Sequence, residues 1–215
     1  MSEKHEALLS FARLAPVIPV VAIQDARRSI DLAQTLVEAG LPVIEVTLRT
    51  PDALDAIAAI AKAVPNAIVA AGTVVTPAQI NEVADAGARF IVTPGTSPLL
   101  ADALAKASLP AMPGCATASE AIALAERGFR ILKFFPAGAS GGSAWLKSVH
   151  GPLPQLSFCP TGGVDASNAA AYLALPNVIC VGGSWVVPPK ALEDGDFETI
   201  GRLAREAAAL RGSLP

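Results

Sequence analysis

Histidine is scarce in this sequence, and the shortage argues against a metal enzyme. The two histidines, His5 and His150, do not stand near a predicted strand end beside carboxylates, so a metal site lacks its usual ligands. We therefore expect no metal and no other cofactor. We also expect His150 to lie in a loop, because Gly151-Pro152 follows it and predicts a turn.

Cysteine is also rare, and its pattern argues against two structural roles. Cys115, Cys159 and Cys180 are odd in number, widely spaced and free of any C-x-x-C pair. This pattern supports neither a disulfide framework nor a zinc knuckle. We expect three small buried thiols in a reducing compartment.

Charge and long apolar runs are both in short supply. Charged residues make up 16% of the chain, and the net charge of -3 offers no basic surface for a nucleic acid. No apolar stretch approaches the roughly 18 residues of a membrane span. The N-terminus mixes charges and lacks the basic-then-apolar order of a secretory signal. A cytoplasmic protein that acts on a small molecule fits these features best.

Hydrophobic residues, in contrast, make up 52% of the chain and can fill a large core. Eight short runs rich in β-branched and apolar residues predict strands. They are Val17–Ile23, Val43–Leu48, Ile68–Ala71, Phe90–Thr93, Leu109–Met112, Ile131–Phe135, Leu156–Cys159 and Val178–Val181.

Stretches with helical spacing lie between these runs. They include Ser29–Ala39, Pro51–Ala63, Pro77–Ala86, Pro98–Ala107 and Ser119–Arg127. Thr50-Pro51 and Thr76-Pro77 predict helix starts, with a hydroxyl N-cap before a proline at the first helical position. Gly40, Gly87 and Gly128 stand where helices are expected to end.

Strand and helix alternate eight times, at a repeat of roughly 20–26 residues, which predicts a (β/α)8 TIM barrel. No interdomain linker is evident, so we expect one domain over residues 1–215, with an N-terminal helix or arm over 1–12 and a final helix over Phe197–Leu210. An open doubly wound sheet is the structural alternative. Its dinucleotide-binding form lacks its main signal, because no G-x-G-x-x-G follows the first strand.

Lys133 places an amine inside an otherwise apolar predicted strand. Burial disfavours a charged ammonium, and desolvation is one way in which proteins make lysine nucleophilic. The remaining lysines fall in segments that predict surface helix or loop; they are Lys4, Lys62, Lys106, Lys147 and Lys190. Lys133 is therefore the first candidate for chemistry.

Further polar residues gather at strand ends, where barrel enzymes place their active sites. The period of two puts Glu45, Thr47 and Arg49 on one face of the second strand. Hydroxyl residues also end three other strands; they are Thr73, Thr93 and Thr161.

An amine, a carboxylate, a guanidinium and several hydroxyls near one barrel mouth form a set suited to Schiff-base chemistry. The lysine would attack a carbonyl carbon, the carboxylate would move protons, and the arginine would hold a substrate carboxylate. The competing interpretation is a buried ion-pair network of Glu45, Arg49 and Lys133 that only fills the barrel. Spacing alone leaves both interpretations open.

Two glycine pairs follow the seventh and eighth strands. Gly162-Gly163 and Gly182-Gly183-Ser184 stand where many barrels bind phosphate through backbone N–H groups. Ordinary tight turns are the alternative. The glycine-rich segment from Gly138 to Gly142 predicts either a loop over the site or a plain connector.

These same residues carry a resemblance to a known family. The chain resembles the bacterial 2-keto-3-deoxy-6-phosphogluconate (KDPG) aldolases over roughly residues 10–210, in order and without evident gaps. The matching motifs are Glu45-Val46-Thr47-Leu48-Arg49-Thr50, Gly72-Thr73-Val74, Pro94-Gly95, Lys133-Phe134-Phe135-Pro136, Cys159-Pro160-Thr161-Gly162-Gly163 and Gly182-Gly183-Ser184-Trp185.

The resemblance implies a class I aldolase of the Entner–Doudoroff pathway, without a cofactor, that cleaves KDPG to pyruvate and glyceraldehyde 3-phosphate. It implies that Lys133 forms the imine with the C2 ketone and that Glu45 moves protons. It further implies substrate contacts from Arg49, Thr73 and Thr161, with phosphate bound by Gly162, Gly163, Gly183 and Ser184. Members of this family are typically homotrimers, so a homotrimer is expected here.

Three other functions remain as alternatives. Two use the same imine chemistry, on 4-hydroxy-2-oxoglutarate or on the galactose-derived epimer of KDPG. Thr161 favours the glucose-derived substrate, because its hydroxyl can pair with a substrate hydroxyl. The third is a non-catalytic phosphosugar-binding barrel, which would have no use for a reactive Lys133. The chain departs from the family pattern at Gly138, where an acidic residue is common, and at Cys115-Ala116.

Overall fold

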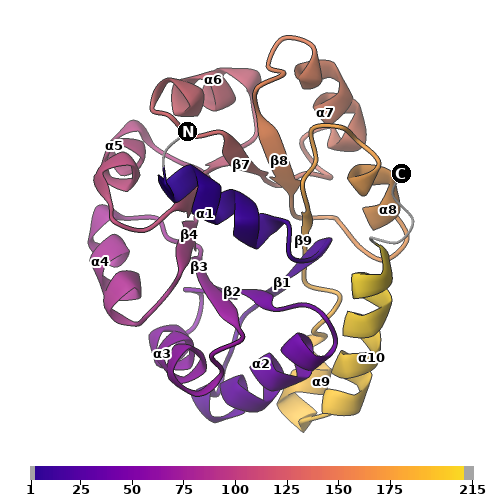
Figure 1. The fold of residues 1–215 in the computed structure, drawn as a ribbon. Helices are drawn as coiled ribbons and strands as arrows, with labels where there is room; N and C mark the ends of the chain where they lie inside the picture. Colours follow the sequence, from indigo (N-terminus) through magenta and orange to yellow (C-terminus); the bar gives the residue numbers. More distant parts are fainter. Residues whose placement is uncertain (1–2, 211–215) are drawn as a thin grey trace.

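Nine parallel strands form a closed ring in residues 3–210, the part of the chain that the computed structural model describes, and helices surround the ring (Figure 1). The strands are β1 (Val17–Val21), β2 (Val43–Thr47), β3 (Ile68–Gly72), β4 (Phe90–Val92), β5 (Ala111–Met112), β6 (Gly114–Cys115), β7 (Ile131–Phe134), β8 (Ser157–Pro160) and β9 (Val181–Gly183). The arrangement is the predicted (β/α)8 barrel.

The strands pair in the order β5-β4-β3-β2-β1-β9 and, separately, β6-β7-β8. Isolated bridges from Phe158 to Val178 and from Thr161 to Gly182 join the segments of β8 and β9. The last strand was predicted over Val178–Val181, but β9 is Val181–Gly183, so that prediction is too early in the chain. The fifth predicted strand, Leu109–Met112, is observed as β5 (Ala111–Met112). The strand β6 (Gly114–Cys115) was not predicted and follows β5 after Pro113. Proline has no N–H to donate to the ladder, so the strand is interrupted while the ring continues.

The helices come between the strands along the chain. They are α1 (Glu3–Ala12), α2 (Ser29–Glu38), α3 (Ala53–Ala63), α4 (Pro77–Asp85), α5 (Pro98–Lys106), α6 (Ala118–Glu126), α7 (Gly142–His150), α8 (Ala169–Leu173), α9 (Pro189–Asp194) and α10 (Phe197–Ala208), with a 3-10 turn η1 at Ala26–Arg28. The helix-ending role of Gly40, Gly87 and Gly128 is confirmed, because each has a φ near +90° after its helix.

One of the two predicted N-caps is correct. Thr76 accepts a hydrogen bond from the Gln79 N–H in a capping box, as predicted. Thr50 is not an N-cap: its hydroxyl donates to the Ile23 carbonyl at 2.6 Å, and α3 begins at Ala53. The threonine side chain instead ties the end of β2 to the loop after β1.

One loop prediction needs correction. His150 is the last residue of α7 and not a loop residue. The segment from Gly138 to Gly142 connects β7 to α7, and Gly142 is already helical. The helix was missed because glycines at its start mask the helical pattern, and Gly151 ends it only after His150.

The interior divides into two layers. Most of the core lies between the strands and the surrounding helices. A second cluster fills the inside of the barrel with Ile18, Val43, Ala70, Phe90 and Ile131, and Leu8 of α1 packs against it. Helix α1 crosses this end of the ring in Figure 1 and closes it. The barrel is therefore blocked at the N-terminal ends of its strands, and polar inward positions occur above this layer.

Candidate active site

Glu45 and Lys133 meet inside the barrel, directly above its apolar layer. Each lies two residues after an inward apolar residue, Val43 on β2 and Ile131 on β7, so both side chains point inward. Lys133 Nζ donates to Glu45 Oε1 at 2.8 Å. The residues are 4% and 3% exposed, so this is a fully buried ion pair.

Gly72 on β3 makes the space for this pair. A Cβ atom at Gly72 would lie 2.3 Å from Glu45 Oε1, which is closer than any real contact. The carboxylate therefore lies directly over the glycine backbone. Only a residue without a side chain fits at this point of the barrel wall.

Arg49 does not join the buried pair. Its Nε donates to Thr47 Oγ1 at 3.0 Å, and the Thr47 hydroxyl donates to the Val21 carbonyl at 2.9 Å. Within residues 3–210 no carboxylate lies within ion-pair distance of Arg49. The three-membered ion network considered from the sequence is therefore reduced to a pair, and the guanidinium remains available for another anion.

A cavity of about 320 Å³ lies at the strand ends beside Arg49. Arg49, Ser184 and Val20 line it together with the loop after β1. Val20 pairs in register with Glu45, so this cavity opens near the buried pair. The structure thus brings a predicted carboxylate-binding residue and a predicted phosphate-binding residue to one cavity.

Thr73 follows β3 with an unusual backbone. Its φ is +59°, and it is the one non-glycine residue with positive φ among residues 3–210. A β-branched residue in this left-handed region is strained, and such strain is common at functional sites. Thr73 is half-buried at the strand end, where sequence analysis placed a substrate contact.

Thr161 and the two glycine pairs lie side by side at the ends of β8 and β9. Thr161 bridges to Gly182, and a Cβ on Gly182 would lie 2.2 Å from Thr161 Oγ1. Gly162 and Gly163 have φ of +88° and +74°, which suits glycine. The tight approach explains why glycine is required at Gly182. Contrary to the prediction, Gly182 and Gly183 lie within β9, whereas Gly162 and Gly163 come after β8.

Two aromatic residues beside these positions were not predicted. The Phe135 ring centroid lies 5.5 Å from Lys133 Nζ, and a Cβ on Gly162 would lie 3.1 Å from that ring. The Trp185 indole lies across Gly183, where a Cβ would overlap it. For Phe135 a signal existed, because the period of two puts it on the same face as Lys133.

Thr93 ends its strand as predicted but makes structural contacts. Its hydroxyl oxygen accepts from the Gly114 N–H at 2.8 Å and lies 2.8 Å from Thr96 Oγ1. These bonds hold the end of β4 to β6 across the Pro113 interruption. The hydroxyl is fully buried and belongs to the barrel wall.

The three cysteines, Cys115, Cys159 and Cys180, are buried, as expected, and none of them forms a disulfide within residues 3–210. Burial raises the pKa of the Cys115 thiol to about 12, with a smaller contribution from the charge of Glu120.

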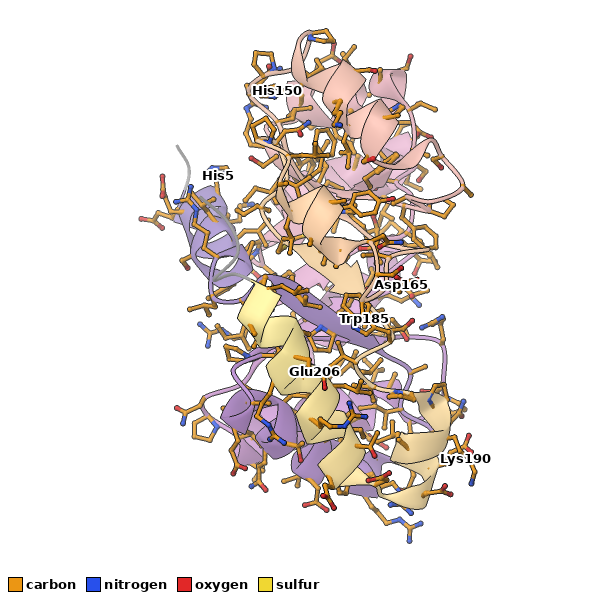
Figure 2. The ribbon with its side chains drawn as sticks, turned by 90° about the vertical axis from the view of Figure 1, so that its right-hand side faces the viewer. His5, His150, Asp165, Trp185, Lys190 and Glu206 are labelled. Carbon is orange, nitrogen blue, oxygen red and sulfur yellow. The ribbon has the colours of Figure 1, made fainter. Side chains whose placement is uncertain are left out.

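No helix of the described residues could span a membrane. Figure 2 shows His5 of α1 at one end of the barrel and Trp185 and Asp165 at the opposite end.

Comparison with known proteins shows the family of this chain. The family model described as KDPG and KHG aldolase matches residues 8–203. The chain is 48% identical over 198 residues to a protein of Escherichia coli K12 named KHG/KDPG aldolase, covering 92% of this chain and 93% of the relative. It is 47% identical over 194 residues to the 2-dehydro-3-deoxy-phosphogluconate aldolase of Dickeya dadantii, covering 90% and 91%.

A solved structure also has a similar fold. The KDPG aldolase of Legionella pneumophila, with pyruvate captured at low pH as a covalent carbinolamine intermediate, superposes with a TM-score of 0.91. The sequence identity is 42%, and the match covers 93% of this chain and 97% of that one.

Proposed function

Because this chain belongs to the KDPG and KHG aldolase family, we propose that it is a class I aldolase that cleaves KDPG to pyruvate and glyceraldehyde 3-phosphate. The observation that carries the proposal is the buried ion pair, with 2.8 Å between Lys133 Nζ and Glu45 Oε1. An amine and a carboxylate at hydrogen-bond distance are the two groups that imine chemistry requires.

The reaction begins with a proton transfer between these two groups. Glu45 takes a proton from Lys133, and the neutral amine attacks the C2 ketone of the substrate to form a carbinolamine. Glu45 then returns its proton to the carbinolamine hydroxyl. Loss of water gives a protonated imine and leaves Glu45 ready to accept another proton. The short distance and the burial of both groups support this step, because the proton moves directly between them.

Cleavage uses the imine as an electron sink. Glu45 accepts the proton of the C4 hydroxyl, directly or through a water molecule, the C3–C4 bond breaks, and its electron pair moves into the imine to give an enamine. The aldehyde leaves, Glu45 returns a proton to C3, and water hydrolyses the imine to release pyruvate and regenerate the amine. One water molecule is released when the imine forms and one is consumed when it is hydrolysed, so the two steps balance.

Other residues hold the substrate in this scheme. Arg49 binds the pyruvate-derived carboxylate with the help of Thr73, and its free guanidinium supports that role. Thr161 contacts the hydroxylated chain. Gly162, Gly163, Gly183 and Ser184 bind the phosphate, which the positive φ of Gly162 and Gly163 and the position of Ser184 on the Arg49 cavity support.

Trapping with borohydride tests the proposal. Pyruvate and borohydride together should add the mass of one reduced pyruvate to the peptide that contains Lys133, and Lys133→Met should remove the adduct. An unchanged mass would favour a phosphosugar-binding barrel without catalysis. Full turnover after treatment with EDTA is also expected, whereas strong loss would contradict a reaction without metal.

Cleavage of 4-hydroxy-2-oxoglutarate is a second candidate activity. The similar Escherichia coli protein carries both KHG and KDPG in its name. The same imine at Lys133 serves both substrates, but an unphosphorylated substrate cannot use the glycine-lined phosphate site. We expect kcat/KM to be higher for KDPG, and comparison of both substrates with the galactose-derived epimer measures the preference.

A homotrimer in the cytoplasm is the remaining part of the proposal. Val75, in the loop before α4, is 51% exposed, and Leu99 of the neighbouring helix α5 is 70% exposed. Exposed apolar side chains of this size suit a subunit contact. Sedimentation equilibrium measures the mass directly, and a monomer would contradict this part.

A further inference from the structure

Two polar side chains at the start of α3 do not cap that helix. Thr50 stands where the sequence predicts an N-cap, yet its hydroxyl donates to the Ile23 carbonyl at 2.6 Å. Asp52 is the N-cap residue of α3, but its side chain makes no capping bond. Its Oδ2 instead accepts a hydrogen bond from the Ala26 N–H at 3.2 Å. Both side chains therefore bind residues 21–26, which run from the end of β1 to the start of η1 and which we call the β1 loop.

This arrangement leaves α3 without a stabilisation that other helices of the chain have. An N-cap side chain normally satisfies a backbone donor of the first turn, and its loss weakens the helix. Thr76 and Thr117 serve α4 and α6 in this way, each in a complete capping box. Departures from such a local rule are expected where a residue has another function. For Thr50 and Asp52 that function is to hold the β1 loop.

Thr47 provides a third bond to the same loop. Its hydroxyl donates to the Val21 carbonyl at 2.9 Å, and its oxygen accepts from Arg49 Nε at 3.0 Å. The segment after β2 therefore holds the β1 loop at three points, and α3 also packs against η1 where the loop ends. We call the side chains of Thr47, Thr50 and Asp52 the loop clamp.

The β1 loop forms one wall of the cavity beside Arg49. Residues 21–25 line this cavity of about 320 Å³ together with Arg49 and Ser184. None of the three residues of the loop clamp lines the cavity itself. A change in Thr50 or Asp52 therefore reaches the cavity only through the loop, whereas a change in Thr47 also reaches it through Arg49.

We propose that Thr50 and Asp52 are positioning residues for substrate binding, because they hold the β1 loop in the place that gives the Arg49 cavity its shape. The inference rests on the proposed function, in which Arg49 binds the carboxylate of the substrate. The clamp orders the loop before the substrate arrives, so binding does not have to order it. Loss of one clamp bond weakens binding and leaves the chemistry intact, since both side chains bond to the loop and not to Lys133 or Glu45.

Borohydride trapping at a series of pyruvate concentrations tests the positioning role. Thr50→Val removes the hydroxyl donor and keeps the shape of the side chain. It should raise the half-saturating pyruvate concentration about three- to tenfold, as expected for one hydrogen bond, and leave the trapping rate at saturation nearly unchanged. Steady-state cleavage of KDPG should likewise show a higher KM with little change in kcat. Thr50→Ser keeps the donor and should restore both values.

Asp52 offers the same test with its own rescue. Asp52→Ala removes the acceptor and should raise KM about three- to tenfold, whereas Asp52→Asn keeps an acceptor oxygen and should stay close to the parent protein. Amide hydrogen exchange shows separately whether the loop is held. The Ala26 N–H donates to Asp52, so its exchange should become faster in Asp52→Ala.

Thr96→Val is the matched control. The Thr96 hydroxyl donates to the Gly114 carbonyl at 2.9 Å, so it also joins two neighbouring strand ends, but it makes no bond to the β1 loop. The variant should lose stability in urea and keep the parent values of KM and of Ala26 exchange.

Several results would overturn the positioning role. Faster exchange of Ala26 with unchanged KM would mean that the clamp holds the loop without serving the substrate. Unchanged exchange in Asp52→Ala would mean that the clamp does not hold the loop. An equal rise of KM in Thr96→Val, or failure of Thr50→Ser to restore KM, would assign the effect to stability alone. Absence of any pyruvate adduct in the parent protein would refute the proposed function itself and, with it, the substrate role of the clamp.

Discussion

The buried pair of Lys133 and Glu45 should make the two residues interdependent in stability. We consider three variants: Lys133→Met, Glu45→Gln and the double substitution. Both replacements keep the approximate shape of the side chain, so they alter charge more than packing. Removal of the ammonium leaves a carboxylate with no cationic partner inside the barrel, and removal of the carboxylate charge leaves an uncompensated ammonium.

The expected loss of unfolding free energy follows from the burial of Lys133 and Glu45 and from the distance between them. The two residues are 4% and 3% exposed and meet at 2.8 Å, so each charge depends on the other for its solvation. Breaking such a pair by removing one partner typically costs about 3–5 kcal/mol, which is a large part of the roughly 5–15 kcal/mol that stabilises a domain. The double variant should be less destabilised than the sum of the single variants by about 1–3 kcal/mol.

Urea unfolding near neutral pH, followed by circular dichroism, measures these free energies. The matched control is the pair of Lys190 and Asp194, which are four residues apart on α9 and largely exposed. Lys190→Met and Asp194→Asn should show no measurable coupling. Additive effects of the Lys133 and Glu45 substitutions would refute the reasoning, because they would mean that the two charges are solvated independently.

Three further predictions concern single positions. Thr47→Val removes the hydroxyl that accepts from Arg49 Nε at 3.0 Å, so steady-state kinetics should show KM for KDPG about tenfold higher with kcat nearly unchanged. Gly72→Ala places a Cβ 2.3 Å from Glu45 Oε1, and displacement of the carboxylate should lower kcat about 100-fold. The buried Cys115 has a pKa of about 12 against an ordinary value of 9.0, so the stability it contributes is complete below about pH 9 and is lost as pH rises toward 12. In urea unfolding, this loss should reach about 1.4 kcal/mol near pH 10.

Each of these predictions has a control. Thr47→Ser keeps the hydroxyl and should restore KM, and failure of this rescue would attribute the effect to packing. Gly95→Ala adds a Cβ with no atom within 4 Å and should leave kcat unchanged, whereas an equal loss would contradict the steric explanation. Cys115→Ala should lack the alkaline loss, and an unchanged pH dependence would assign the loss to other groups.

The barrel was readable from the sequence because its signals are local. Strand runs, helix spacing, the Thr76 cap and the glycines after the helices each depend on residues close in the chain. They were confirmed, except that the last strand was predicted over Val178–Val181 and is observed at Val181–Gly183. The errors also have local causes. Pro113 ends the predicted run, so β6 after it was missed, and glycine at positions 141 and 142 hides the start of α7.

For the site, the sequence predicted candidate residues but not the contacts between them. Alternation along β2 and β7 put Glu45 and Lys133 on inward faces, but partners across a barrel are 88 residues apart, and no local pattern states that they touch. Thr93 and Thr161 look alike in sequence, since each ends a strand. The contacts of Thr93 with Gly114 and Thr96 place it in the barrel wall, and only the packed structure separates the two threonines.

The sequence by itself determined the alternation of strand and helix, the inward position of Lys133 and the glycine turn after β8, because short-range sterics and periodicity fix these features. The tertiary structure alone decided that Lys133 pairs with Glu45, that Arg49 instead donates a hydrogen bond to Thr47, and that Tyr172 reaches the start of α7. These contacts arise when strands and helices that are distant in the chain close into one ring. The physical reason is that hydrogen bonds and ion pairs act over a few ångströms in space, whatever the separation along the chain.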